Sequence, residues 1–262
     1  MEIRKIVITR PSGPYAGGRR LAERLNEVGL LSFELPLLEC RAIALSDHDR
    51  RLAKEGLGAS AGSWLAFLSP TAVWVWRELI QSDQELIELT ARARLAAQGS
   101  GTSAALVECF GRAADFTPSV FVAEEFAREF AVRSKKGECV LVPQSADGRD
   151  LLAPTLRASG VDAVAISTYR LEQARISEEQ LENYRAFIDD GTALVFMSPS
   201  AVRAGVALIG GDLARLRLVS VGPITSQAIK SAGHTVWREA HEHSEEGIIK
   251  ALSEPEFRGG ED

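Results

Sequence analysis

Cysteine and long apolar runs are scarce in this sequence. Its 262 residues include three cysteines, Cys40, Cys109 and Cys139, which are too few and too scattered for a disulfide framework or a metal-binding knuckle. Each lies among apolar neighbours, so we expect reduced core residues. No apolar run approaches the length of a membrane-spanning helix, and no signal-peptide core precedes the strand expected from Ile3. We therefore expect a cytoplasmic protein that has no membrane partner.

A net positive charge is also missing. The formal net charge is -6 at pH 7, which disfavours nucleic acid as a partner because that interaction depends on clustered Lys and Arg. Backbone N–H groups at helix N-termini can still bind a small anion without such an excess. The hydrophobic fraction of 45% and the charged fraction of 25% are typical of a soluble globular protein.

Motifs for the common cofactors and nucleophiles are missing as well. Gly99-x-Gly101 lacks the third glycine of a dinucleotide-binding loop, and no Walker-type phosphate loop is present. Ser198-Pro199-Ser200 lacks the flanking glycines of a nucleophile elbow. His241 and His243 have no third ligand in view, so a solvated loop is the simpler interpretation than a metal site. We expect no metal and no organic cofactor.

An internal repeat is what the sequence does contain. Ser69-Pro70 and Ser198-Pro199 each follow a short apolar run and precede a helical pattern, and they are offset by 129 residues. Gly99-x-x-Thr102 and Gly222-x-x-Thr225 repeat in the same way, offset by 123 residues. This repeat predicts two similar α/β lobes, Rossmann-like or flavodoxin-like, with parallel sheets.

Two local patterns add to this prediction. Trp74 and Trp76 are two residues apart on one expected helix and cannot share a face, so we expect one in the core and the other at a partly exposed surface. Pro36 disfavours a central strand, so the segment around it is predicted to be an edge strand or a connector.

Hydroxyl-bearing turns follow several of the expected strands. The turns are Thr9-Arg10-Pro11, Ser69-Pro70, Gly99-Ser100-Gly101-Thr102, Gln144-Ser145, Ser198-Pro199-Ser200 and Gly222-Pro223-Ile224-Thr225. Each turn taken singly is more often a helix cap than a ligand contact, and Thr225 or Ser226 is a candidate cap of the helix that follows. The carboxyl ends of strands are nevertheless the edge of an open α/β sheet where ligands bind. Turns from two lobes predict a cleft lined with N–H groups and hydroxyls, suited to a ligand rich in carboxylates.

In their order along the chain, these motifs resemble those of the uroporphyrinogen-III synthase family. The matching segments are Ile8-Thr9-Arg10-Pro11, residues 68–73, residues 99–102, Asp150-Leu151, Gly160, Tyr169-Arg170, residues 197–202 and residues 221–225. The resemblance spans nearly the whole chain. It implies a cyclising lyase that converts hydroxymethylbilane to uroporphyrinogen III, with loss of water and inversion of the last pyrrole ring, in haem biosynthesis. The family uses no metal or organic cofactor.

The resemblance also implies how the lobes follow one another in sequence. In the family the first strand–helix unit joins the C-terminal third of the chain, and the middle of the chain forms the other lobe. Residues 1–38 and 172–262 are therefore expected to form one discontinuous lobe and residues 39–171 the second, with two extended linkers between them. We expect the protein to act as a monomer.

Roles for individual residues follow from the same resemblance. Tyr169 falls on the tyrosine that helps the substrate hydroxyl leave, and a phenol with a pKa of about 10 is protonated at neutral pH and can donate a hydrogen bond. The alternative for Tyr169 is a packing residue with a satisfied hydroxyl. The residues expected to hold the acetate and propionate carboxylates are Arg10, Ser69, Thr102, Ser198, Ser200 and Thr225.

Two competing hypotheses remain open for the function. The first is a non-catalytic module of the same fold that binds a tetrapyrrole or another anion. The second is a nucleotide-dependent α/β enzyme, which predicts saturable binding of a dinucleotide.

Overall fold

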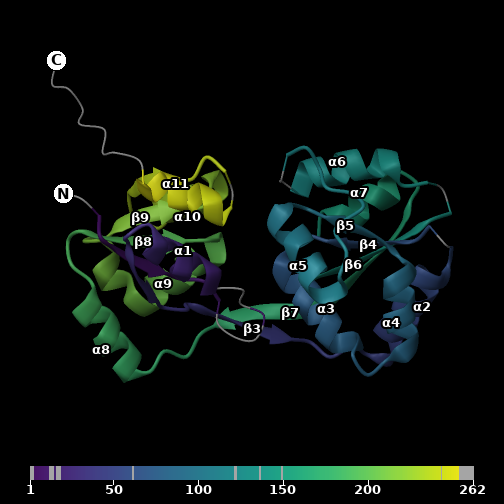
Figure 1. The fold of residues 1–262 in the computed structure, drawn as a ribbon, viewed down its shortest axis with the longest axis horizontal. Coiled ribbons are helices and arrows are strands. Elements are labelled where there is room, and N and C mark those ends of the chain that lie inside the picture. Colours follow the sequence, from purple (N-terminus) through teal and green to yellow (C-terminus); the bar gives the residue numbers. More distant parts are fainter. Residues whose placement is uncertain are drawn as a thin grey trace, which may run out of the picture. The chain divides into compact units, whose positions relative to one another are not determined.

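The computed structural model describes residues 3–11, 15, 19–60, 62–120, 123–135, 137–148, 150–242 and 244–253. The chain divides into two compact units, each with helices packed around a five-stranded sheet (Figure 1). Unit 1 comprises Met1–Glu39 and Glu172–Asp262, and unit 2 comprises Cys40–Leu171. None of the helices among the described residues combines the length and the hydropathy needed to cross a lipid bilayer.

Unit 1 is built on a parallel sheet. Its strands are β1 (Lys5–Ile8), β2 (Leu31–Glu34), β8 (Thr192–Phe196), β9 (Arg217–Ser220) and β10 (Val236–Glu239). Its helices are α1 (Arg19–Glu27), α8 (Glu178–Phe187), α9 (Pro199–Leu213), α10 (Pro223–Ser231) and α11 (Glu245–Ser253). The strands lie in the order β10-β9-β8-β1-β2, and each neighbouring pair is parallel.

Unit 2 has a sheet in the order β3-β7-β6-β4-β5. Its strands are β3 (Leu38–Ala42), β4 (Trp64–Phe67), β5 (Arg94–Ala97), β6 (Cys139–Ser145) and β7 (Asp162–Gln173), of which β3 and β7 run across the boundaries of the units. Its helices are α2 (Asp47–Gly58), α3 (Pro70–Ile80), α4 (Gln84–Arg92), α5 (Ser100–Phe110), α6 (Ala123–Arg133) and α7 (Leu152–Ala158). The pairs among β4, β5, β6 and β7 are parallel.

The two sheets share one strand order. When the edge strand β3 is left out, the first strand of each unit (β1 or β4) lies between the second (β2 or β5) and the third (β8 or β6), and the fourth (β9 or β7) follows the third. This is the flavodoxin-like order. The predicted fold class of two similar parallel α/β units is therefore confirmed.

The position of β3 at the edge of the sheet is explained by Pro36. The strand begins two residues after Pro36, which has no backbone N–H to offer a second neighbouring strand. Ile43 N donates to Thr168 O at 2.8 Å and Ala174 N donates to Leu37 O at 3.0 Å, so β3 and β7 are antiparallel. The prediction that the segment around Pro36 leads to an edge or a connector is confirmed.

Buried apolar strands form the centre of both units. Every residue of β4 and of β8 is buried, which is expected where helices cover both faces of a parallel sheet. In unit 2 the core includes an aromatic cluster of Trp64, Phe116, Phe126 and Phe130. The core of unit 1 is aliphatic at its centre, with Ile6, Ile8, Leu21, Leu25, Val195 and Ile248.

The two tryptophans of α3 divide as predicted. Trp76 is fully buried, and its Nε1–H donates to the hydroxyl of Thr90 at 3.1 Å. Trp74 is half-buried. The prediction from their spacing is confirmed, because residues two apart on a helix point in nearly opposite directions.

Tyr184 of α8 carries a buried hydroxyl that has no hydrogen-bond partner among the described residues. Burial raises the pKa of this phenol. Because an unpaired buried hydroxyl costs free energy, we expect Tyr184→Phe to raise the free energy of unfolding by about 1 kcal/mol. Urea denaturation checks this, with Tyr169→Phe as a control that removes a paired hydroxyl and gives no gain. A clear loss of stability in Tyr184→Phe would contradict the prediction.

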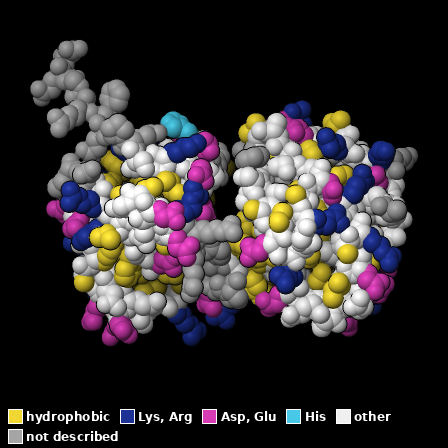
Figure 2. All heavy atoms as spheres, viewed as in Figure 1, with side chains coloured by type: hydrophobic (Ala, Val, Ile, Leu, Met, Phe, Trp, Pro, Cys, Tyr) yellow, Lys and Arg dark blue, Asp and Glu magenta, His cyan; other side chains and the backbone are white. Residues whose placement is uncertain are grey.

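Charge is well mixed on the visible surface of each unit. Figure 2 shows acidic and basic side chains interspersed over the described part of the face in view. On the described part of this face no broad basic surface is present that would attract an anionic ligand.

Candidate functional site

The strand order places a candidate site within each unit. In flavodoxin-like sheets the connections leave the first and third strands toward opposite faces, and ligands bind beyond the carboxyl ends of these strands. In unit 2 these strands are β4 and β6, and in unit 1 they are β1 and β8. Every residue predicted to bind substrate lies at or next to such an edge.

In unit 2 the structure brings Ser69 and Tyr169 together. Ser69 follows β4 and caps α3, where its Oγ accepts from Ala72 N at 3.2 Å. The Tyr169 hydroxyl lies 3.0 Å from the same Oγ. Because Ser69 already accepts from the backbone, it can donate its proton to the tyrosine oxygen and leave the phenolic proton for a third group.

A β-bulge in β7 positions Tyr169. Gln144 pairs with Ser167 but Ser145 pairs with Tyr169, so Thr168 is the extra residue. Thr168 and Tyr169 are consequently both buried, although neighbouring residues of a regular strand face opposite sides. The bulge aims Tyr169 across the end of β6 toward Ser69.

The environment keeps the Tyr169 phenol protonated. The side chain is 7% exposed, and burial raises its pKa above the usual value, while the hydrogen bond with Ser69 acts in the opposite direction. Negative charge on the Cys40 thiolate would raise the pKa further. The group is therefore a proton or hydrogen-bond donor at neutral pH and not a base.

Thr102 and Thr225 occupy equivalent positions in the two units. Each is the third residue of its helix, α5 or α10, and each is buried. The preceding caps are Gly99 and Gly222, which provide no side-chain hydrogen bond to the helix. Since the first turn of a helix leaves its N–H groups without intrahelical partners, these two helices offer them to a ligand.

The predicted cap of α10 was wrong. Neither Thr225 nor Ser226 is the cap, because the helix begins at Pro223 and Gly222 precedes it. Proline fits the first helical position, where its fixed φ is already helical and no N–H is needed. Ser226 instead lies 2.6 Å from the Ser220 hydroxyl and bonds to Glu239.

In unit 1, Ser198 lies between β8 and α9, and Ser200 is the second residue of α9. Ser198 caps α9, with its Oγ accepting from Ala201 N at 3.1 Å. Ser200 is half-buried and accepts from the Arg203 guanidinium at 3.1 Å. Ser198 thus repeats the local structure of Ser69, as the offset of the two Ser-Pro turns predicted.

Arg10 is already paired in the structure. It follows β1 and forms an ion pair with Glu245, the first residue of α11. Its neighbour Thr9 is buried, with the hydroxyl donating to Val195 O at 2.7 Å. A substrate carboxylate at Arg10 would compete with Glu245, which sequence reasoning missed because the two residues are 235 positions apart.

Gln144 is a further candidate for the site, which was not singled out from the sequence although the turn Gln144-Ser145 was included among the hydroxyl-bearing turns. Its Oε1 is buried and has no hydrogen-bond partner among the described residues. The feature of the sequence that could have indicated Gln144 is its position at the carboxyl end of β6, the third strand in the order of the sheet.

Two sequence predictions stay predictions: the cleft shared by the two lobes, and the interpretation of His241 and His243 as part of a solvated loop. The shared cleft concerns both units together, whereas the structure describes each unit by itself. His243 lies outside the described residues, and within the part of the chain that is described, no group of three or more His, Cys, Asp or Glu could hold a metal ion.

Comparisons with known proteins agree with this architecture. The sequence model of the family described as uroporphyrinogen-III synthase HemD matches residues 19–250. The crystal structure of uroporphyrinogen-III synthetase from Helicobacter pylori aligns with a TM-score of 0.63 and 17% identity, over 95% of this chain and 97% of that one. A mutant uroporphyrinogen III synthase from the extremely thermophilic bacterium Thermus thermophilus aligns with a TM-score of 0.53 and 17% identity, over 94% of this chain and 95% of that one.

The two kinds of comparison support different statements. No curated protein matches the sequence. At 17% identity the two crystal structures establish the fold alone. The family match covers most of the chain, and with it the initial resemblance is confirmed: the chain belongs to the uroporphyrinogen-III synthase family.

Proposed function

We propose that the protein is an active uroporphyrinogen-III synthase that converts hydroxymethylbilane to uroporphyrinogen III. The reaction breaks the bond between the hydroxymethyl carbon and its oxygen, releases water and closes the ring with the last pyrrole inverted. Membership in the family and the flavodoxin-like units support this proposal.

One structural observation carries the proposal that the ligand is rich in carboxylates. The four helices that follow the repeated turns, α3, α5, α9 and α10, have no acidic residue in the first turn. Helices α2, α4, α6, α8 and α11 each carry one or two, whereas α1 and α7, which follow β1 and β6, also carry none. Acidic residues near an N-terminus neutralise the helix dipole, so their absence at these four positions leaves sites suited to anions.

In unit 2 the N-termini of α3 and α5 lie next to each other. In unit 2, a Cβ added at Gly101 in α5 would lie 3.9 Å from Pro70 Cγ in α3. The N–H groups in the first turn of α5, the Thr102 hydroxyl and the Ser69 turn therefore lie close together, next to the Tyr169 hydroxyl. We propose that acetate and propionate groups of the substrate bind there, and at the equivalent Ser198 and Thr225 positions of unit 1.

We assign to Tyr169 the donation of a hydrogen bond to the departing hydroxyl. Its phenol is protonated and its oxygen can accept from Ser69, which polarises the O–H bond toward the leaving group. Departure of the hydroxyl with a proton gives water and a cation on the bilane. The cation can close by itself to the wrong isomer, so the protein must orient the last ring and exclude water.

The isomer of the product tests this proposal. Freshly made hydroxymethylbilane is incubated with the protein, and the products are separated against a protein-free blank. We expect type III well above the blank. Type I alone would overturn the proposal and favour the non-catalytic binding module. Tyr184→Phe is a suitable matched variant, since Tyr184 lies away from the strand-end turns and its loss should leave the isomer ratio unchanged.

A further inference from the structure

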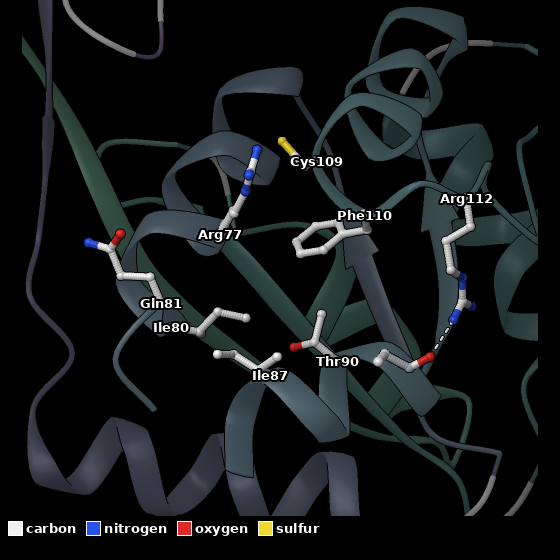
Figure 3. A pocket seen from close by; sticks show the side chains of 9 residues that line it. Arg77, Ile80, Gln81, Ile87, Thr90, Cys109, Phe110 and Arg112 are labelled. Atoms are coloured by element: carbon white, nitrogen blue, oxygen red, sulfur yellow. Dashed lines mark hydrogen bonds between the residues drawn. The ribbon is translucent and has the colours of Figure 1, made fainter. Parts of the chain in front are cut away.

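A hollow lies in unit 2, at the other end of the helices that carry the candidate site. It has a volume of about 340 Å³ and is lined by the C-terminal parts of α3 and α5 together with α4 (Figure 3). The residues of α3 and its cap that line the hollow are Arg77, Ile80 and Gln81, so the hollow begins about 12 Å from the Ser69 turn along the helix and extends to about 18 Å. It is separate from the proposed substrate site.

The hollow suits the apolar body of a small molecule. Ile80, Ile87 and the ring of Phe110 line it, with the Phe110 ring in the middle of the view and the two isoleucines below it (Figure 3). Pockets of a few hundred Å³ with apolar walls and a few polar groups are typical of small-molecule sites. A single ring with a short chain fits this volume, whereas a tetrapyrrole does not.

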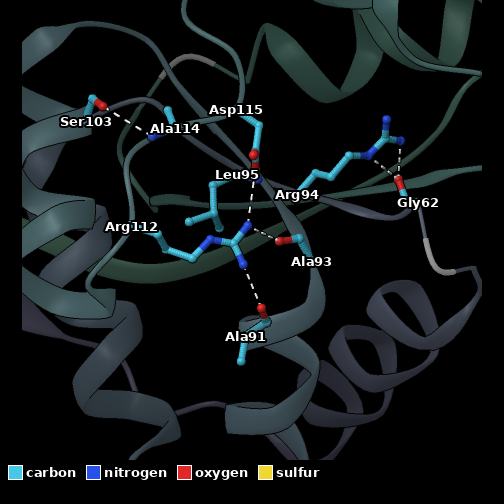
Figure 4. A network of polar contacts seen from close by, with 9 residues as sticks. All are labelled: Gly62, Ala91, Ala93, Arg94, Leu95, Ser103, Arg112, Ala114 and Asp115. Atoms are coloured by element: carbon cyan, nitrogen blue, oxygen red, sulfur yellow. Dashed lines mark hydrogen bonds and ion pairs between the residues drawn. The ribbon is translucent and has the colours of Figure 1, made fainter.

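Of the two arginines in the wall, one is occupied by the protein itself. Arg112 donates to Ala91 O at 2.6 Å and to Ala93 O at 2.7 Å, and it pairs with Asp115 at 3.1 Å (Figure 4). It thereby satisfies carbonyls at the C-terminus of α4. Arg112 is structural and has little left to offer a ligand.

Arg77 is in the opposite situation. It is exposed, and no carboxylate among the described residues pairs with it; its side chain lies next to the Cys109 thiol at one side of the hollow (Figure 3). Thr90 provides a second polar group. It is almost fully buried and accepts from Trp76, but its own hydroxyl proton has no acceptor among the described residues. The hollow therefore presents one cation without a carboxylate partner and one unused donor around an apolar floor.

We propose that this hollow binds a small arylalkyl carboxylate. The carboxylate pairs with the Arg77 guanidinium, and the apolar body lies against Phe110, Ile80 and Ile87. This assignment is independent of the proposed catalytic activity, because it rests on residues of α3, α4 and α5 that do not contact the Ser69 turn.

The cysteines provide a local reporter for binding. Cys40 and Cys139 are buried, while Cys109 lines the hollow and is partly exposed. We expect iodoacetamide to alkylate Cys109 first in the native protein, as shown by peptide mass spectrometry. With 4-phenylbutyrate as the probe, we expect saturable slowing of this alkylation by about tenfold, because the carboxylate bound at Arg77 lies next to the Cys109 thiol and blocks access to it.

Matched probes and variants decide whether the carboxylate is recognised. The neutral amide of 4-phenylbutyrate should need about a tenfold higher concentration for half-protection, since it forms no charge-assisted hydrogen bond. Arg77→Gln should weaken protection by 4-phenylbutyrate by a similar factor, with each variant compared with its own unprotected rate. Arg92→Gln, at a side chain 78% exposed on α4 outside the hollow, should bind like the unchanged protein. No protection, or equal protection by the acid and the amide in the unchanged protein, would overturn the proposal.

Discussion

Replacing Tyr169 by phenylalanine is expected to slow formation of uroporphyrinogen III by about a hundredfold, the usual contribution of a positioned proton donor. The change removes the hydroxyl that lies 3.0 Å from Ser69 Oγ and leaves the ring in place. The departing oxygen then loses its donor, while contacts to the substrate carboxylates remain. The rate constant at saturating hydroxymethylbilane, measured from the type III product, checks this expectation.

The fold should survive this substitution. Ser69 Oγ keeps its bond from Ala72 N, so the cap of α3 is retained, and the loss of one hydrogen bond costs about 1 kcal/mol. Binding of the product should be nearly unchanged. Tyr184→Phe is the control, as a buried tyrosine of unit 1 with no partner for its hydroxyl among the described residues. Unchanged turnover in Tyr169→Phe would remove Tyr169 from the mechanism without touching the family assignment.

The pH dependence of the rate of uroporphyrinogen III formation is a second test of the role of Tyr169. Burial raises the Tyr169 pKa above its usual value, so the phenol stays protonated through the neutral range. The ratio of the rates of the unchanged protein and Tyr169→Phe should therefore be constant from about pH 6 to pH 9. Above the raised pKa the phenolate cannot donate, and the ratio should fall toward one. A ratio that falls already below about pH 8 would mean that another group supplies the proton.

Phe130→Ala is expected to have the largest effect on stability, a loss of about 3–5 kcal/mol in the free energy of unfolding. Phe130 is fully buried in α6, and its ring centroid is 4.9 Å from that of Trp64, 5.2 Å from Phe116 and 5.3 Å from Phe126. Removal of the ring loses contacts with all three neighbours and leaves a cavity that fixed strands and helices cannot close.

Val132→Ala is the matched control for Phe130→Ala. Val132 lies two residues further along α6 and is 85% exposed, so its truncation should change stability by no more than about 0.5 kcal/mol. Urea denaturation followed by tryptophan fluorescence is a suitable measurement, because Trp64, Trp74 and Trp76 are in unit 2 and only Trp237 is in unit 1. Similar midpoints for Phe130→Ala and Val132→Ala would contradict the assigned role of the aromatic cluster.

Local features of the fold could be predicted because neighbouring residues determine them. Ser69 and Ser198 cap their helices through bonds to N–H groups three residues away, and both helices begin with proline. Helical spacing predicted that one of Trp74 and Trp76 is buried and the other partly exposed, but it did not indicate which of the two is buried. The wrong prediction that Thr225 or Ser226 caps α10 also concerned neighbouring residues. The pair Gly222-Pro223 starts the helix earlier than a cap at either hydroxyl would.

Pairings between distant residues could not be predicted in this way. The resemblance pointed to Tyr169, but only the bulge at Thr168 shows how it reaches Ser69 across the end of β6. The partner of Arg10 is in α11, and nothing near Arg10 in the sequence indicates Glu245. The sequence also could not distinguish Arg112 from Arg77. Arg112 donates hydrogen bonds to carbonyls at the end of α4, whereas Arg77, within the part of the chain that is described, does not.

The sequence by itself determined that the chain has two similar α/β units and that hydroxyl-bearing turns follow their strands. Those properties depend on apolar periodicity, glycine and proline, and capping side chains, each of which acts over a few residues. The tertiary structure decided which turns lie together and which side chains are left without partners. Strand order and burial set those relations, and both arise from contacts between segments that are far apart in the chain.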